Sequence, residues 1–369
     1  MIRWRTGTVE RLGRGWHGAQ EITVALVART PDDPATVRAL AYPDLVGQPE
    51  VGDQVLLNTN ALALGLGTGG YAMVVALPGR LPEDTPVPGH IVKARYSPLQ
   101  TIRLAADEEA SPHRDVLAAA QDLDGMPVVV ADLHSALPAI LAGIHADAPH
   151  ARVAYLLTDG GALAAGFSRT LDALRDRLAG TVSTGQAWGG DLEAVNVHTG
   201  LLAARHVLRA DITILSQGPG NLGTGTTWGF SGVAAGEAVN ATATLGGRPV
   251  GALRISDADP RPRHRGVSHH SLTAFGRVAL APADLVVPAE LSEPLAADVA
   301  RALAPLAARH RIVTVSTTGL DEALRATPVK LSTMGRDLDN DHAYFLTCAA
   351  AGRHAAALAE GRAPSHRLA

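Results

Sequence analysis

The stretch Val128-Val-Val-Ala-Asp-Leu-His-Ser135 opens the most regular part of this sequence, because four small apolar residues run directly into polar ones. A short, continuous Val-rich run is typical of a strand that is buried on both faces of a parallel sheet. Further runs of this kind follow along the chain: Val153–Leu157, Thr181–Ser183, Ile212–Leu215, Ala252–Ile255, Leu285–Val287 and Ile312–Val315. Together they predict a predominantly parallel sheet.

Helical segments separate these runs. One begins at Ser168, a residue type that caps helices, and is predicted to end at Gly180. A second covers 194–208, where apolar residues recur at steps of three and four, and a third begins at Ser292. Alternating strands and helices predict an α/β fold, for which we favour an open, doubly wound sheet. An eighth run at Val329–Ser332 keeps a TIM barrel as the alternative.

The amino-terminal part has a different pattern. Its short β-rich runs are broken by Gly, Pro, Asp and Asn: Thr6–Leu12, Glu21–Val27, Val37–Ala41, Gln54–Asn58 and Tyr71–Leu77. They predict a small β-barrel over residues 1–88. Residues 89–110 are interpreted as a linker with a joining strand, and 111–369 as the α/β ligand-binding domain.

Composition excludes several classes of protein. Apolar residues make up 46% of the 369, which is a globular composition, and no run approaches the length of a membrane span. The net charge of −4 argues against nucleic acid as a partner. With Cys348 alone, no intrachain disulfide forms. We therefore expect a cytoplasmic protein with no membrane association, and leave homo-oligomerisation open.

Polar residues gather in the loops that follow the predicted strands, whereas the loops after the helices carry few. Parallel strands deliver such loops to one edge of a sheet, so these loops predict a ligand site there. The candidate catalytic residues lie after the first two strands and in a later basic loop. They are Asp132, His134, Asp159, His269 and His270. Aspartate and histidine suit acid–base work near neutral pH.

A glycine-rich loop, Gly218-Pro-Gly220-Asn221-Leu-Gly223-Thr224, follows the fourth strand and precedes a helical segment. Its glycines let the backbone approach a phosphate, and the helix start offers N–H groups to an anion. We therefore predict that Gly218, Gly220, Asn221, Gly223 and Thr224 bind ligand. NAD(P) is not expected, because the motif normally opens the first β-α unit and the acidic residue that binds ribose is missing at its usual spacing.

The densest cationic segment contains Arg261, Arg263 and Arg265. Arginine presents paired donors that match carboxylate or phosphate oxygens, so we favour anion binding by this loop. The alternative is that Asp257 and Asp259 pair with these arginines in a structural network.

A divalent metal is a further candidate, although the cofactor is left open. Asp132 and His134 stand two apart after a strand and form half of a metal site. Asp159, Asp191, Glu193, His198 and the pair His269–His270 are the residues that could complete it. Asp191 and Glu193 are also predicted to bind ligand. No zinc motif of recognised spacing is present.

Several of these stretches together resemble a bacterial family of unknown function, DUF3866. They are Pro49–Asn58, Leu64–Tyr71, Val130–Ser135, Thr158–Gly161, Gly189–Asn196, Gly218–Thr226 and Arg265–His270. The likeness extends over nearly the whole chain. It implies a single full-length architecture and transfers no activity, cofactor or catalytic residue.

The leading hypothesis is a small-molecule enzyme that acts on an anionic substrate, phosphorylated or carboxylated, by metal-assisted or His/Asp acid–base chemistry. The alternative is a sensor or scaffold that binds a metabolite without turnover. Bound divalent metal beside the aspartates would favour the enzyme. A tightly held metabolite that is not converted would favour the sensor.

Overall fold

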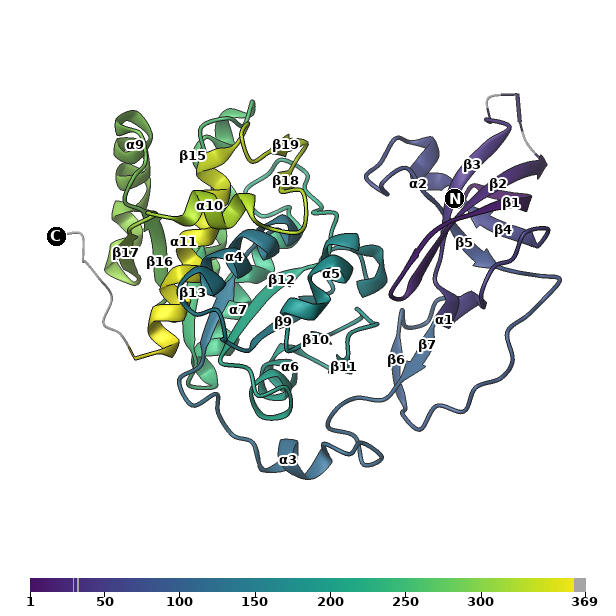
Figure 1. Cartoon of the computed structure of the whole chain (residues 1–369), viewed down its shortest axis with the longest axis horizontal. Coiled ribbons are helices and arrows are strands. Elements are labelled where there is room, and N and C mark those ends of the chain that lie inside the picture. Colours follow the sequence, from purple (N-terminus) through teal and green to yellow (C-terminus); the bar gives the residue numbers. More distant parts are fainter. Residues whose placement is uncertain (29, 32, 362–369) are drawn as a thin grey trace.

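The first part of the chain forms a closed five-stranded barrel (Figure 1). In the computed structural model, which describes residues 1–28, 30–31 and 33–361, its strands are β1 (Trp4–Trp16), β2 (Ala19–Ala28), β3 (Thr36–Ala41), β4 (Gln54–Asn58) and β5 (Ala72–Ala76). They pair in the order β1-β2-β3-β5-β4, and β1 closes on β4. Alternate residues such as Val9, Ile22 and Leu57 fill the interior. The predicted barrel is confirmed.

The β1–β2 hairpin attaches the barrel to the larger domain. Trp16 Nε1 donates to the carbonyl oxygen of Gly166 at 2.6 Å. Gly18 and Gly166 pack backbone to backbone, since a Cβ on Gly166 would lie 2.8 Å from the Gly18 carbonyl oxygen. A second hairpin, β6 (Ile91–Lys93) and β7 (Thr101–Arg103), lies between the two parts and carries a buried ion pair from Lys93 to Glu193. The barrel is thus held against the β11 end of the large sheet (Figure 1).

The larger domain is built on one open sheet of eight parallel strands. They are β8 (Pro127–Val130), β9 (Val153–Thr158), β10 (Gly180–Ser183), β11 (Leu192–Glu193), β12 (Ile212–Gln217), β13 (Arg248–Ala252), β16 (Asp284–Pro288) and β17 (Arg311–Val315). Their order is β11-β10-β9-β12-β8-β13-β16-β17. The α/β class is confirmed. The sheet is not closed, so the TIM-barrel alternative is wrong.

Helices cover both faces of this sheet. One face packs against α4 (Leu137–Asp147), α5 (Arg169–Leu174), α10 (Leu320–Arg325) and α11 (His342–Ala359). The other packs against α6 (Val197–Leu202), α7 (Ala234–Thr244), α8 (His269–Thr273) and α9 (Glu293–Leu303). Shorter elements are α1 (Pro43–Val46), α2 (Asn60–Ala63), α3 (Arg114–Ala119) and the two-stranded pairs β14 (Ile255–Ser256) with β15 (Gly266–Val267) and β18 (Ser332–Thr333) with β19 (Arg336–Asp337). None of the described helices is long and apolar enough to cross a membrane.

Three local predictions need correction. Gly180 does not end the helix that Ser168 caps but is the first residue of β10, and that helix ends at Leu174. The strand predicted at Ala252–Ile255 is β13 at Arg248–Ala252, because Pro249 and Gly251 conceal a strand from a search for Val-rich runs. The run Val329–Ser332 joins no large sheet. It leads instead into the small β18–β19 hairpin.

Candidate functional site

Three neighbouring strands deliver polar residues to the carboxyl edge of the sheet. β8 lies between β12 and β13. Asp132 follows β8, Gln217 is the last residue of β12, and the segment from Arg254 follows β13. Gln217 Nε2 donates to the backbone carbonyl of Asp132 at 2.9 Å, which ties two of these loops together. The strand order therefore places residues from distant parts of the chain side by side.

A cluster of three imidazoles lies at this edge. His264 ends a 3-10 turn (Pro262–His264), and His269 and His270 form the first turn of α8. Their ring centroids are 4.4 to 4.9 Å apart. Phe230 stacks on the His270 ring at 3.8 Å and an interplanar angle of 2°. The rings are held in fixed orientations against each other.

Asp132 faces this cluster. Its Oδ2 lies 3.5 Å from His270 Nδ1, without hydrogen-bond geometry. Both side chains are more than nine-tenths buried. Within the described part of the chain, four buried polar atoms here have no hydrogen-bond partner: Asp132 Oδ2, His270 Nδ1, His269 Nε2 and Gln217 Oε1. Buried polar atoms in native proteins nearly always have hydrogen-bond partners. Four such atoms without partners therefore mark this edge of the sheet as the candidate site.

The electrostatic surroundings keep two of the imidazoles neutral. Burial, followed by the charges of Arg254 and Arg261, lowers the pKa of His264 to about 3. Burial and the neighbouring His270 lower the pKa of His269 to about 4. Both rings therefore carry an available lone pair at neutral pH.

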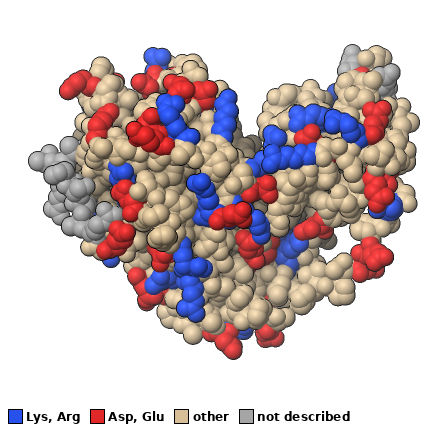
Figure 2. Space-filling model, viewed as in Figure 1, with Lys and Arg blue, Asp and Glu red and all other residues tan. Residues whose placement is uncertain are grey.

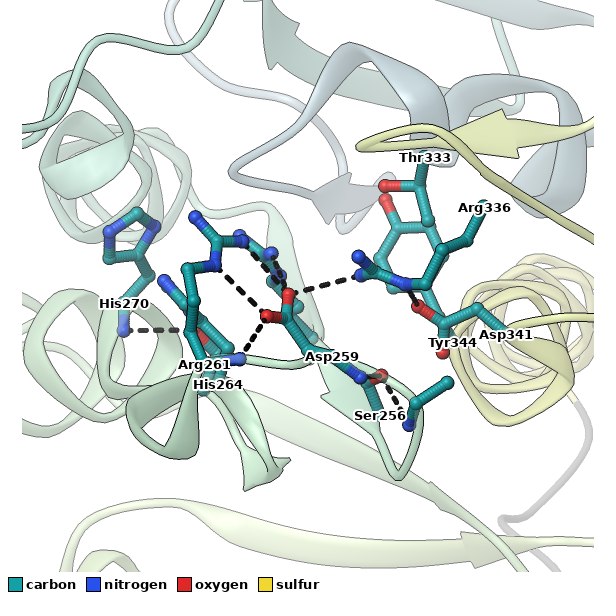
Figure 3. Close-up of polar contacts among 12 residues, drawn as sticks. Ser256, Asp259, Arg261, His264, His270, Thr333, Arg336, Asp341 and Tyr344 are labelled. Atoms are coloured by element: carbon teal, nitrogen blue, oxygen red, sulfur yellow. Dashed lines mark hydrogen bonds and ion pairs between the residues drawn. The ribbon is translucent and has the colours of Figure 1, made fainter.

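Next to the imidazoles, Asp259 is the centre of a buried ion-pair network (Figure 3). Its carboxylate accepts from Arg254 at 3.0 Å, from Arg261 through two nitrogens at 2.8 and 2.9 Å, and from Arg336 at 3.0 Å. Arg336 also pairs with Asp341. Arg265 Nε donates to the Asp259 backbone carbonyl. Arg261 and Arg265 are thus engaged in the structural network that was the alternative to anion binding.

Arg263 is the exception in the basic loop. It is exposed and, among the described residues, forms no hydrogen bond or ion pair. Its guanidinium lies beside the glycine-rich loop, because a Cβ on Gly225 would be 3.8 Å from one of its nitrogens. Gly220 and Gly225 have φ of +93° and +81°, which other residues adopt only with strain. Arg263 thus lies beside this loop, and its guanidinium has no partner among the described residues.

The glycine-rich loop does not lead directly into a helix. Gly223 and Phe230 form an antiparallel bridge, and α7 begins only at Ala234. Asn221 Oδ1 accepts from Gln217 and from Ser231, which anchors the base of the loop. The predicted helix start is therefore not available to an anion bound at Gly218–Thr224, and Arg263 is the nearby cation instead.

A family model described as "Protein of unknown function (DUF3866)" matches residues 38–352 of the chain. The match runs from β3 of the barrel into α11 and includes every residue of the cluster. The chain belongs to the DUF3866 family. No curated protein matches it. The description of DUF3866 names no activity, so the chemistry of the site is the basis for a proposed function.

Within this DUF3866 chain, His134 lies apart from the imidazole cluster. Its Nδ1 contacts the Tyr155 hydroxyl at 2.8 Å and its Nε2 contacts Ser168 Oγ at 2.7 Å. Burial lowers its pKa to about 4. Both ring nitrogens of His134 already have hydrogen-bond partners on other side chains, so His134 does not face Asp132 as a metal ligand. We leave it out of the proposed site.

The other acidic candidates lie toward the β11 end of the sheet. Asp159 is exposed after β9 and accepts from the Gln186 backbone N–H at 2.8 Å. Asp191 accepts from Thr181 and pairs with Arg175. Glu193 pairs with Lys93. β9 and β12 separate β10 from β8, so Asp191 and Glu193 are not brought to the imidazoles.

Several residues of the site and of the Asp259 network were missed from the sequence. Arg254 is a charged residue inside the apolar run predicted as a strand, and Gln217 ends the run that begins at Ile212. A lone polar residue in such a run signals a buried partner, and that signal was present in both cases. Arg336 follows the run Val329–Ser332, and nothing in its surroundings points to Asp259.

Proposed function

We propose that this DUF3866 protein is a small-molecule enzyme that acts on an anionic substrate, phosphorylated or carboxylated, at the carboxyl edge of β8, β12 and β13. The observation that carries the proposal is the group of buried, unpartnered polar atoms on Asp132, His269, His270 and Gln217. Desolvated groups of this kind are costly to a fold and are retained where a ligand satisfies them.

The roles follow from position. Asp132 and His270 face each other and are suited to proton transfer at a bound substrate. Arg263 and the loop at Gly220–Gly225 lie at the exposed side, where an anionic group would be held. Figure 2 shows the molecular surface hollowed between the barrel and the larger domain, with basic side chains on both sides of the hollow.

Replacing Arg263 by Ala is expected to weaken binding of inorganic phosphate or sulfate by about 1.5–3 kcal/mol, the value of one charged hydrogen bond. That is roughly a 10- to 150-fold higher Kd. Unfolding without anion should change by less than about 0.5 kcal/mol, since the side chain is exposed. Calorimetric titration and thermal unfolding with and without the anion measure both quantities.

Arg301→Ala is the matched control, because Arg301 is an arginine on α9 with 77% of its side chain exposed and only a surface pair with Asp298. It should bind the anion as wild type does. Equal binding by Arg263→Ala and wild type would remove Arg263 from the site. If wild type binds neither phosphate nor sulfate, the proposal that its substrate is anionic is wrong.

Turnover is tested on a panel of phosphate monoesters and of esters that also carry a free carboxylate. Wild type should convert at least one of them, and Asp132→Asn and His270→Ala should each lower kcat at least about 100-fold, the usual effect of losing general acid–base catalysis. Binding of anions without turnover across the panel would favour the metabolite sensor over the enzyme.

A further inference from the structure

The three imidazoles have the composition and spacing of a metal site. One ring nitrogen from each of His264, His269 and His270 lies within 4.8 Å of the other two. In a tetrahedral site with metal–nitrogen bonds of about 2.0–2.1 Å, neighbouring ligand atoms are about 3.3–3.4 Å apart. Binding an ion would require these nitrogens to draw together by up to about 1.4 Å, from 4.8 to 3.4 Å.

Asp132 adds a carboxylate beside one of the three imidazoles, outside the group of ring nitrogens that lie within 4.8 Å of one another. Its Oδ2 is 3.5 Å from His270 Nδ1, close to one edge of a tetrahedron. Both atoms, with His269 Nε2, are buried and lack hydrogen-bond partners among the described residues. A direct hydrogen bond would satisfy the pair at a shorter distance. An ion bound between Asp132 and His270 would satisfy both of these atoms.

The residues around the ligands fix their orientation. His264 Nδ1 is 2.7 Å from Ser268 Oγ, which leaves Nε2 as the ring nitrogen open to a metal. Ser268 Oγ also accepts from the His270 backbone N–H and so caps α8. Metal-binding histidines normally place their second nitrogen in a hydrogen bond of this kind.

We propose that His264, His269, His270 and Asp132 bind one divalent transition-metal ion. Three imidazoles with one carboxylate suit Zn²⁺, Co²⁺ or Ni²⁺, whereas Mg²⁺ and Ca²⁺ prefer oxygen ligands. The ion would act as a Lewis acid on a substrate oxygen, and Asp132 and His270 would then hold the ion instead of transferring protons themselves. This deepens the function proposed above and rests on it for the reaction, but metal binding is measured without any substrate.

Co²⁺ titration of the full-length protein, after removal of metal with a chelator, tests the proposal. Wild type should bind one equivalent of Co²⁺ and develop the intense visible absorption of four- or five-coordinate Co²⁺. Adding Zn²⁺ should then displace the Co²⁺ and abolish this absorption. His264→Ala and His269→Ala should each raise the Kd at least about 100-fold, since even residues that only orient a ligand contribute 10- to 100-fold. Ser268→Ala should raise it by about 10- to 100-fold.

His198→Ala is the matched control, because His198 is an exposed histidine on α6 outside the cluster. It should bind Co²⁺ as wild type does, while His269→Gln keeps the bulk of the side chain if the alanine variant fails to fold. The proposal is overturned if wild type gives only the faint spectrum of octahedral Co²⁺, or if the cluster variants bind as tightly as His198→Ala. If the protein binds one ion tightly but converts no substrate, the proposed metal site stands and the proposed enzymatic activity is wrong. If the chelator leaves turnover unchanged, the proposed enzymatic activity stands and the proposed role of the metal ion in it is wrong.

Discussion

Replacing Asp259 by Ala is expected to destabilise the folded protein by about 3–5 kcal/mol, the usual cost of breaking a buried ion pair from one side. Asp259 is fully buried and accepts from three arginines, of which Arg254 is itself only 2% exposed. Without the carboxylate, Arg254 remains charged in the interior with no partner among the described residues, and Arg336 on the β18–β19 hairpin loses its bond to Asp259. Urea unfolding monitored by circular dichroism measures the difference.

Asp257→Ala provides the control two residues away, because Asp257 is exposed. It should change the free energy of unfolding by less than about 0.5 kcal/mol. If the two variants unfold alike, the three arginines do not depend on Asp259, and the network is not a structural element.

The difference in unfolding free energy between wild type and Asp259→Ala should also depend on pH. Burial would raise the pKa of Asp259, but hydrogen bonds from Arg261 and the charges of Arg261 and Arg336 outweigh it and hold the pKa far below its usual range. An aspartate whose pKa is lower in the folded than in the unfolded protein contributes its full stabilisation above the unfolded-state pKa of about 4. This contribution is lost as the pH falls toward the folded-state pKa. The stability gap between wild type and Asp259→Ala should therefore be constant above about pH 5 and narrow below about pH 4.

Replacing Gly352 by Val is expected to destabilise the protein by about 3 kcal/mol or more, at the upper end for over-packing a core. α4 and α11 cross at two glycines. A Cβ on Gly352 would lie 2.0 Å from the Ile140 carbonyl oxygen, and one on Gly143 would lie 1.9 Å from that of Ala349. Both contacts are with backbone, so no side-chain rotation relieves them and the helices must separate.

Ala359→Val, at an exposed position on the same helix, controls for the low helix propensity of valine. It should cost less than about 1 kcal/mol, because the substitution fills open space. Thermal unfolding of both variants gives the comparison. A Gly352→Val protein as stable as Ala359→Val would show that the two helices are not in close backbone contact.

The sequence predicted the elements whose residues differ from their surroundings. Val128–Val130 and Val153–Leu157 are apolar runs bounded by polar loops, and both are strands of the sheet. Ser168 was predicted to cap a helix, and its side chain accepts from the Leu171 N–H. Ser292 precedes α9 as predicted. In these cases the signal is local, because caps and short strands depend on neighbouring residues.

α4 and α11 were not predicted, although both are central to the core. Nearly every residue of α11 from Ala343 to Leu358 is buried, and α4 is buried from Leu137 to Ile144. A helix that is buried on all sides has no polar face, so the period of 3.6 residues disappears from its sequence. The glycines Gly143 and Gly352, which read as interruptions, are instead the points of closest contact.

By itself, the sequence determined that this protein is α/β with an amino-terminal barrel, and that its polar loops follow strands, because hydrophobic runs and turn residues act over a few positions. Only the tertiary structure decided which loops meet. Asp132 joins His264, His269 and His270 because β8 pairs with β13, while His134, two residues away, turns to Tyr155 and Ser168. It also decided that Asp259 binds Arg261, while Arg263 pairs with none of the residues that the structure describes. Strand order and side-chain pairing arise from contacts between distant segments, and no local pattern encodes them.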